Sequence, residues 1–468
     1  MRKKRETESF FTWDRGFYRS LFSLFTIVVL QNLAAYSVNM ADNIMLGGYD
    51  QTALSGAATV NQIFFLVQQL AMAIGEGLTV LTAQYWGQGR VSPIRRLTGT
   101  ALKWGAGAGT FALCLCFLLP RQLVGIFTSD QAIVAAGVTY LRGIEWTFPL
   151  FIVSQILVTA LRSVEVVWIG LWTSLLSLAI NVGVNYTLIF GHFGAPELGL
   201  QGAAIGTLLA RIAELLAVVW YLAVKDQRLK LFSENFLRRD PGLERDFLRI
   251  AMVVVSGGMC WAISVPLQTA VLGHLPGGVS SDAIAANSVA TTFYQYLKVF
   301  VIAMSASSSV LIGKTVGQGD LGRLRKEART LSVLDVVVGL LFGALLFLLR
   351  KPLLSLYSLR PSAMKMADQL IVVMSVVMVG MAYQMPVSGG ILRAGGDTRF
   401  TTGVTIISTW CIVMPLSYLS GYVWKLPVWA VVCFIQSDQI FKGLPIFLRF
   451  RTYKWVKKLT RPEDPGPA

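Results

Sequence analysis

The segment Val-Leu-Thr-Ala-Gln-Tyr-Trp-Gly-Gln-Gly at residues 80–89 returns 230 residues later as Val-Leu-Ile-Gly-Lys-Thr-Val-Gly-Gln-Gly at residues 310–319. At the same shift, Thr52–Arg90 overlays Asp282–Asp320 without a gap. Each Gly-Gln-Gly element follows a long apolar stretch and precedes a basic loop. The sequence therefore predicts two related halves with the same internal order of elements.

The composition is that of a polytopic membrane protein. Of 468 residues, 54% are hydrophobic and only 14% are charged, and the mean hydropathy is +0.60. Soluble globular chains carry about 25% charged residues. These values exclude a disordered chain, a fibrous protein and an ordinary soluble enzyme.

Apolar stretches long enough to cross a bilayer predict an all-α fold of about twelve transmembrane helices. They lie at about 20–46, 54–84, 97–119, 132–159, 166–190, 200–224, 247–273, 283–313, 328–349, 364–390, 400–421 and 427–449.

The basic residues predict the orientation. Lys and Arg number 41 against 25 Asp and Glu, a net charge of +16. They concentrate in short segments that each follow an even number of spans, which is typical of cytoplasmic loops. We therefore expect a multi-pass protein of the plasma (inner) membrane with both termini in the cytoplasm. Anionic lipid headgroups, rather than nucleic acid, are the expected partners of this charge.

The chain divides at its longest charged loop, which contains the turn signal Asp240-Pro241-Gly242. Six spans on each side insert with the same orientation, so the symmetry axis should follow the membrane normal. The predicted segments are a cytoplasmic N-terminal segment (1–19), an N-lobe (20–224), a cytoplasmic linker (225–246), a C-lobe (247–450) and a cytoplasmic tail (451–468).

Metal, disulfide and nucleophile chemistry are not indicated. The five cysteines lie in apolar runs without metal-ligand spacing, and the chain has only two histidines, His192 and His274. No nucleophile, base or metal constellation supports an enzyme such as a membrane-embedded transferase. We expect no cofactor.

Several motifs resemble the multidrug and toxic compound extrusion (MATE) family along nearly the whole chain. They comprise Met40-Ala-Asp-Asn-Ile-Met-Leu-Gly47, Asn61-Gln-Ile-Phe64 leading to Ala83–Gly89, Asn181-Val-Gly-Val-Asn185 with Ile189-Phe-Gly191, Gly202-Ala-Ala-Ile-Gly-Thr207 and Ile391-Leu-Arg-Ala-Gly-Gly-Asp-Thr398. The resemblance implies two six-helix lobes around a V-shaped cleft. It also implies an antiporter that exports cationic or amphiphilic compounds in exchange for H⁺ or Na⁺.

Asp42 is the first candidate for coupling, because a charge inside the membrane is costly and usually functional. The resemblance places a coupling carboxylate at this position. Asn181 and Asn185 lie four residues apart, on one helix face, and Thr207 matches a polar residue of the same cluster. In some relatives the second asparagine is an aspartate. Proton binding at Asp42 is the favoured hypothesis, and Na⁺ held by Asp42, Asn181 and Asn185 is the alternative.

Other polar or aromatic residues within the spans are candidates for the substrate cleft: Tyr36, Gln62, Glu76, Trp261 and Lys298. Three interpretations of Lys298 are open: a neutral buried amine, the partner of a carboxylate such as Asp335 or Glu76, or a side chain that extends to the membrane interface. The pairs Arg211 with Glu214, and Asp438 with Lys442, are spaced for salt bridges within one helix.

The C-terminal half departs from the sodium-coupled relatives. Their acids in spans seven and ten are missing from Met259–Pro266 and Met381–Pro386. We therefore expect no cation site in the C-lobe and coupling through the N-lobe. A lipid-intermediate flippase of the same superfamily would need a strongly cationic cleft, and a transport-inactive receptor remains a further alternative. We expect a monomer.

Overall fold

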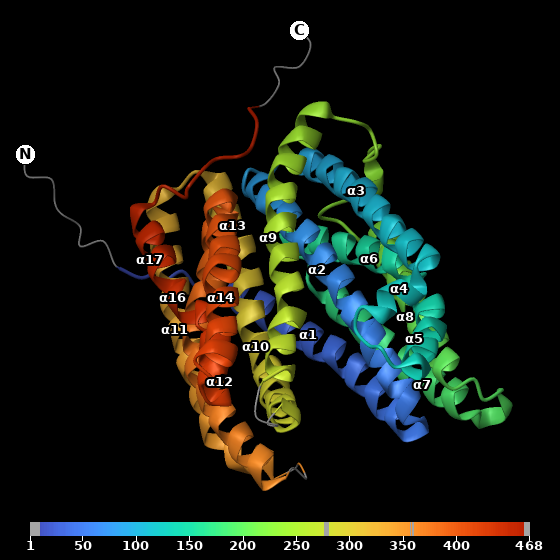
Figure 1. The fold of residues 1–468 in the computed structure, drawn as a ribbon. Coiled ribbons are helices and arrows are strands. Elements are labelled where there is room, and N and C mark those ends of the chain that lie inside the picture. Colours follow the sequence, from blue (N-terminus) through green and yellow to red (C-terminus); the bar gives the residue numbers. More distant parts are fainter. Residues whose placement is uncertain (1–9, 276–279, 356, 358–359, 463–468) are drawn as a thin grey trace, which may run out of the picture. The chain divides into compact units, whose positions relative to one another are not determined.

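The computed structural model describes residues 10–275, 280–355, 357 and 360–462, and these residues form helices without any β-strand (Figure 1). The basic run Met1–Arg5 and the last six residues of the predicted tail lie outside this range. The longer helices are α1 (Arg15–Tyr49), α2 (Gln51–Gly87), α3 (Val91–Leu118), α5 (Gln131–Ile144), α6 (Thr147–Ser163), α7 (Trp168–Phe190), α8 (Leu200–Val224), α9 (Pro241–Gly273), α10 (Ser280–Gln318), α11 (Leu321–Leu354) and α12 (Pro361–Met385).

Shorter elements complete the chain, and several are π-helical turns that continue a span. They are α4 (Pro120–Gly125), η1 (His192–Gly194), η2 (Leu231–Ser233), η3 (Pro386–Leu392), α13 (Thr398–Ile406), η4 (Ile407–Val413), α14 (Met414–Tyr418), η5 (Leu419–Val423), α15 (Val428–Ile435), α16 (Asp438–Phe441) and α17 (Gly443–Thr452).

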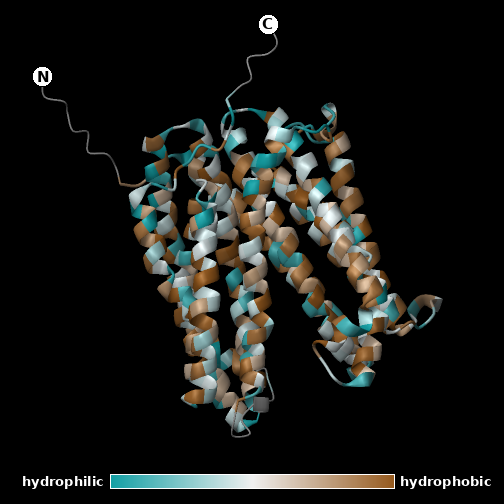
Figure 2. Cartoon of the chain, turned by 45° about the horizontal axis from the view of Figure 1, so that its top comes forward, coloured by the Kyte–Doolittle hydropathy of each residue, from teal (hydrophilic) through white to brown (hydrophobic). Residues whose placement is uncertain are grey.

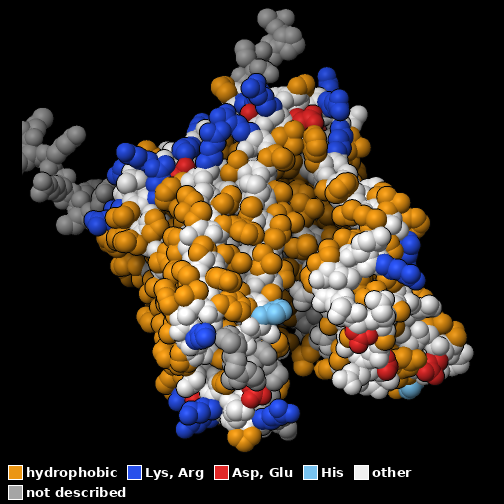
Figure 3. All heavy atoms as spheres, in the orientation of Figure 1, with side chains coloured by type: hydrophobic (Ala, Val, Ile, Leu, Met, Phe, Trp, Pro, Cys, Tyr) orange, Lys and Arg blue, Asp and Glu red, His pale blue; other side chains and the backbone are white. Residues whose placement is uncertain are grey.

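Among the described residues, eleven helices are long and apolar enough to cross a membrane. The bent pair α5–α6 supplies a twelfth when it is taken as one span. The predicted all-α fold with about twelve spans is therefore confirmed. The hydropathy colouring in Figure 2 shows predominantly hydrophobic helices. In Figure 3, hydrophobic side chains cover the helices along their length, and most Lys and Arg gather near their ends.

The fourth span is broken where the sequence predicted a continuous stretch. α5 and α6 meet at an angle of 50°, and the break lies at Glu145 and Trp146. Pro149 is the third residue of α6. A proline cannot donate to the carbonyl four residues before it, and its ring crowds that carbonyl, here that of Glu145. The bend thus has a local cause in the sequence.

The described chain forms two compact units. Unit 1 comprises residues 1–26, 83–90 and 263–468, and unit 2 comprises residues 27–82 and 91–262. α1, α2 and α9 each pass from one unit to the other, so the end of α2 belongs to the unit built mainly from the second half.

In unit 2, small residues permit close helix packing. α3 packs on α6 and α7 packs on α8. A Cβ atom added to Gly109 of α3 would lie 2.7 Å from the Cα of Pro149, and one added to Gly105 would lie 2.3 Å from Ile156. Such close approach at glycine positions supports helix association inside lipid, where helices lack the hydrophobic driving force.

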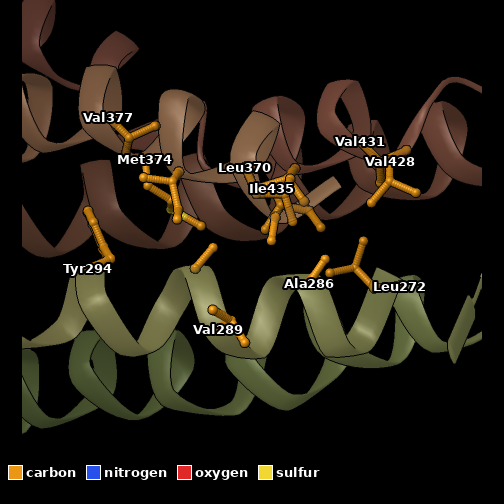
Figure 4. Close-up of a cluster of buried hydrophobic side chains, with 14 of the residues drawn as sticks. Leu272, Ala286, Val289, Tyr294, Leu370, Met374, Val377, Val428, Val431 and Ile435 are labelled. Atoms are coloured by element: carbon orange, nitrogen blue, oxygen red, sulfur yellow. The ribbon is translucent and has the colours of Figure 1, made fainter. Parts of the chain in front are cut away.

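In unit 1, an apolar core joins α9, α10, α12 and α15. Figure 4 shows Ala286 and Val289 of α10 on the side of that helix that faces Leu370 and Met374 of α12. Ile435 of α15 belongs to the same cluster of buried side chains. The combination of small and large residues lets these helices pack closely.

The repeated Gly-Gln-Gly elements meet within unit 1 in a reciprocal contact. A Cβ atom on Gly87 would lie 2.0 Å from the carbonyl oxygen of Lys314, and one on Gly317 would lie 2.0 Å from that of Gln84. Gly87 and Gly317, like Gln84 and Lys314, are equivalent positions of the two repeats. α2 and α10 therefore touch backbone to backbone across a local pseudo-twofold axis, where only glycine fits.

The C-terminal segment after α17 binds the same end of α2. The Gln84 amide donates to the carbonyl oxygen of Ala394 at 3.0 Å and accepts from the backbone N–H of Leu459 at 2.9 Å. Gln88 donates to the Thr460 hydroxyl at 2.6 Å. Chain segments more than 300 residues apart in sequence are thereby fastened together.

Asp397, in the loop between η3 and α13, anchors this segment. Its buried carboxylate accepts from Arg449 Nε at 2.7 Å and from Lys457 Nζ at 2.6 Å. Burial opposes ionisation of Asp397, but hydrogen bonds from Arg449 and Lys457, together with their charges, hold its pKa below the ordinary value.

The close contact of α2 with α10 predicts that Gly87→Ala is destabilising. The new methyl group has to displace the Lys314 carbonyl, so the free energy of unfolding should fall by about 1–3 kcal/mol. Thermal unfolding of the purified protein in detergent measures this. Gly107→Ala is the matched control, since nothing lies within 4 Å of its Cβ position. Equal unfolding temperatures for the two variants would contradict the contact.

The ion pairs of Asp397 predict a pH-dependent loss of stability. Because its pKa is lowered by folding, the carboxylate stabilises the fold above the unfolded pKa of about 3.9. That contribution is lost as the pH falls through the folded pKa. Asp397→Asn should therefore lower the free energy of unfolding at neutral pH by about 1.5–3 kcal/mol.

The unfolding temperatures of wild type and Asp397→Asn are measured at neutral pH and below about pH 4. The difference between the two proteins should be smaller in acid, because the wild-type carboxylate is then increasingly protonated. Asp320→Asn serves as the control, because Asp320 caps α11 and asparagine caps a helix equally well. A difference in unfolding temperature that grows in acid would refute this role of Asp397.

Candidate functional site

The four predicted coupling residues come together inside unit 2. Asp42 lies on α1, Asn181 and Asn185 lie on α7, and Thr207 lies on α8. All four are buried, and the two asparagines have no exposed surface. The spacing of four residues places both asparagines on the side of α7 that faces Asp42 and α8.

Hydrogen bonds connect the cluster. Asn185 Nδ2 donates to Asp42 Oδ1 at 2.5 Å and lies 3.4 Å from Asn181 Oδ1. Asn181 also acts on Asp42 as a hydrogen-bond partner, and its Nδ2 donates to Thr207 Oγ1 at 3.4 Å. Thr207 in turn donates to the Ala203 carbonyl at 3.0 Å. The amide donors that face the carboxylate are therefore held in place by several hydrogen bonds.

Tyr140 of α5 is a fifth member of this cluster that the sequence analysis missed. It is fully buried, it hydrogen-bonds with Thr207, and its phenol interacts electrostatically with Asp42. Nothing in its local sequence distinguished it from an apolar helix face. Only the packing of α5 on α8 brings it to Asp42.

Gly206 makes room for the asparagine. A Cβ atom at this position would lie 2.0 Å from Asn185 Oδ1. That oxygen accepts no hydrogen bond from any described residue. Asn185 therefore directs its donor to Asp42 and keeps its acceptor unused beside Gly206.

Arg211 and Glu214 form the salt bridge within α8 that their spacing predicted. Arg211 Nη1 lies 2.6 Å from Glu214 Oε2, and Glu214 also accepts from Ser154 at 3.1 Å. The guanidinium lies over the Phe151 ring at 4.7 Å. Its charge also acts on Asp42, so it contributes a favourable field to the cluster while its own partner is Glu214.

Comparison with known proteins identifies the family. The model of the MatE family matches residues 28–187 and 262–419, one match in each half of the chain. The chain belongs to the MatE family. The multidrug resistance protein MdtK of Photorhabdus laumondii is 25% identical over 418 residues, covering 86% of this chain and 87% of MdtK. MdtK of Cronobacter sakazakii is 23% identical and covers 88% and 89%.

Solved structures of MATE transporters share the fold. The eukaryotic MATE transporter AtDTX14 superposes with a TM-score of 0.85 at 16% identity, covering 95% of this chain and 97% of its own. A MOP superfamily transporter from Pyrococcus furiosus, described as having a binding pocket of reverse polarity, gives a TM-score of 0.83 at 16% identity, with 93% and 95% covered. At this identity the likeness concerns the fold.

The residues predicted to contact the substrate are distributed over several helices. Gln62 and Glu76 are exposed on α2, and Tyr36 on α1 is half-buried. Trp261 on α9 lies with its ring 6.2 Å from that of Phe65. These four residues belong to unit 2, whereas Lys298 belongs to unit 1.

The expected pairing of Lys298 with Asp335 is wrong. Neither carboxylate oxygen of Asp335 bonds to a residue in the described ranges, and the charge that acts on Lys298 is that of Asp438. Asp438 also forms the predicted pair within its helix, with Lys442 Nζ at 2.6 Å. The sequence could not show which acid the fold would bring to Lys298.

Gly206→Ala should disrupt the Asp42 cluster without touching a charge. The added methyl group would overlap Asn185 Oδ1, so the amide has to leave Asp42, and we expect a loss of about 1–3 kcal/mol of stability. Gly183→Ala on α7 is the control, since nothing lies within 4 Å of its Cβ position. Thermal unfolding of both variants measures the difference. An unaffected Gly206→Ala protein would argue against the packed amide.

Proposed function

We propose that the chain is a secondary active antiporter that exports amphiphilic or cationic compounds in exchange for protons bound at Asp42. The observation that supports this is a buried carboxylate held by the amides of Asn181 and Asn185 inside a membrane-spanning bundle. Ionisable groups at such positions are rare and usually lie on ion or substrate pathways.

The cluster has partners for both protonation states of Asp42. When ionised, the carboxylate accepts the N–H of Asn185, as seen here. When protonated, its O–H needs an acceptor, and rotation of the Asn185 amide would offer the oxygen that now has no partner among the described residues. Binding or loss of one proton would thus reverse a hydrogen bond between α1 and α7.

The same donors favour H⁺ over Na⁺. A sodium ion needs several oxygen ligands, whereas Asn185 presents an N–H to Asp42, and Thr207 gives its proton to a backbone carbonyl and receives the N–H of Asn181. Among the described residues, no three His, Cys, Asp or Glu side chains are grouped as metal ligands. Sodium coupling remains the alternative within the same fold.

The substrate class follows from the relatives and from the exposed side chains. The MdtK relatives are named as multidrug resistance proteins. Glu76 offers an exposed carboxylate on α2, and Trp261 and Phe65 offer aromatic surface for a cation or a planar compound. We place the protein in the plasma (inner) membrane with both termini in the cytoplasm, because basic residues concentrate in alternate loops.

Dye efflux in inside-out membrane vesicles tests the proposal. Ethidium transport is driven separately by a proton gradient and by a sodium gradient, for wild type and for Asp42→Asn. We expect proton-driven transport in wild type and a loss of at least about tenfold in the variant, because asparagine cannot exchange a proton. Asp130→Asn, an exposed helix cap, is the charge-matched control and should transport like wild type.

Two results would overturn the proposal. Transport driven only by the sodium gradient would assign the cluster to Na⁺. Full proton-driven activity of Asp42→Asn would move the coupling site elsewhere. The absence of ethidium transport under either gradient would instead favour a lipid-intermediate flippase or a receptor that does not transport.

A further inference from the structure

A second carboxylate lies inside the membrane-spanning part of unit 1, where the sequence analysis expected no ion site. Asp335 is in α11, about 21 Å along the helix from Leu321, and has no exposed surface. Neither of its oxygens accepts a hydrogen bond, and no ion pair involves it, among the residues that the structure describes. Burial has removed the water around this carboxylate, and no hydrogen bond or ion pair with a described residue compensates for that loss.

Every other buried acid in the described ranges has a hydrogen bond or an ion pair in place of the lost water. Asp42 accepts from Asn185, Glu214 pairs with Arg211, and Glu327 pairs with Arg323 and accepts from Thr315. Asp397 and Asp438 each bind a basic side chain. Glu145, like Asp335, accepts no hydrogen bond from a described residue, but its carboxylate lies 3.8 Å from the Arg142 guanidinium. The lack of both a hydrogen bond and an ion pair therefore distinguishes Asp335 from the other buried acids of the described ranges.

Two hydroxyl groups that have no hydrogen-bond partner among the described residues lie on the helices packed against α11. Gly339, one turn further along α11, packs on Ala382 of α12. The next residue, Tyr383, is the phenol on which the charge of Asp335 acts. The Tyr383 hydroxyl is buried and bonds to no described residue.

On α10, a serine lies near the same level as Asp335. Phe300 of α10 stacks on Phe342 of α11 with ring centres 3.9 Å apart, and Asp335 lies seven residues before Phe342. Ser308 lies eight residues after Phe300 on the antiparallel helix, and its side chain packs beside Gly390 of η3. The Ser308 hydroxyl is buried and also bonds to no described residue.

The charged groups on the packed elements lie further away. Lys298 on α10 is about 14 Å along its helix from this level, and Glu327 on α11 is about 12 Å from Asp335. Arg393, after η3, is about 10 Å beyond the level of Asp335 on its own helix.

We propose that Asp335 is a proton-binding site of the second repeat, and that it holds its proton as a neutral carboxylic acid in this conformation. Release breaks the O–H bond, leaves the electron pair on the carboxylate and passes the proton to water when the helices separate. Tyr383, whose phenol interacts with Asp335, and Ser308, which lies near the same level of α10, are then the candidate hydroxyl donors to the anion. The site is separate from Asp42 and does not depend on the coupling role proposed for it.

Infrared spectroscopy of the purified full-length protein tests this site without any transport. A buried neutral acid gives a carbonyl stretching band that an ionised carboxylate lacks. We expect wild type to show this band at neutral pH and Asp335→Asn to lose it, while Asp42→Asn keeps it. Asp335→Asn should also fold with unchanged or higher thermal stability, because asparagine resembles the neutral acid.

Tyr383→Phe is the second variant, and it keeps the test open if Asp335→Asn does not fold. Removal of the hydroxyl donor should shift the pH at which the band disappears upwards, since the anion loses a partner. The proposal is overturned if Asp335→Asn retains the band, or if Tyr383→Phe leaves its pH dependence unchanged. It is also overturned if sodium chloride abolishes the wild-type band, because the group is then a cation ligand. The infrared results do not depend on transport. They would stand even if the transport experiment showed that Asp42 is not the coupling site.

Discussion

The backbone contact between α2 and α10 is the constraint on which the arrangement of unit 1 depends. Gly87 and Gly317 each lie against a carbonyl oxygen of the other repeat. Any side chain at either position would force the two helices apart. The C-terminal segment then fastens the same helix end through Gln84 and Asp397. A motif that repeats in the sequence thus becomes a pair of identical contacts related by local symmetry.

Two buried carboxylates, one in each repeat, have opposite surroundings. Asp42 is surrounded by amide and hydroxyl groups that are already linked to one another, so its ionised form has partners. Asp335 has none among the described residues. In the two proposals made above, this difference decides which carboxylate holds a proton in a given conformation, because neither group is hydrated inside the membrane. On these proposals, one chain holds two acids that exchange protons under different conditions.

The sequence was sufficient for the features that depend on periodicity and spacing. These include the spans, the repeat, the salt bridge of Arg211 with Glu214 and the shared helix face of Asn181 and Asn185. The association of Asp42 with the two asparagines followed from the family resemblance. It was insufficient where tertiary packing decides. Tyr140 reaches the cluster only because α5 packs on α8, and the acid near Lys298 comes from another helix. The isolation of Asp335 is likewise a property of its neighbours.

The central claim is that Asp42 links proton exchange to substrate binding. The most direct measurement is the number of protons that the purified protein releases when it binds ethidium in weakly buffered detergent solution. The account predicts release by wild type and fewer protons per bound ethidium for Asp42→Asn. Equal release by the two proteins, or none by wild type, would contradict it.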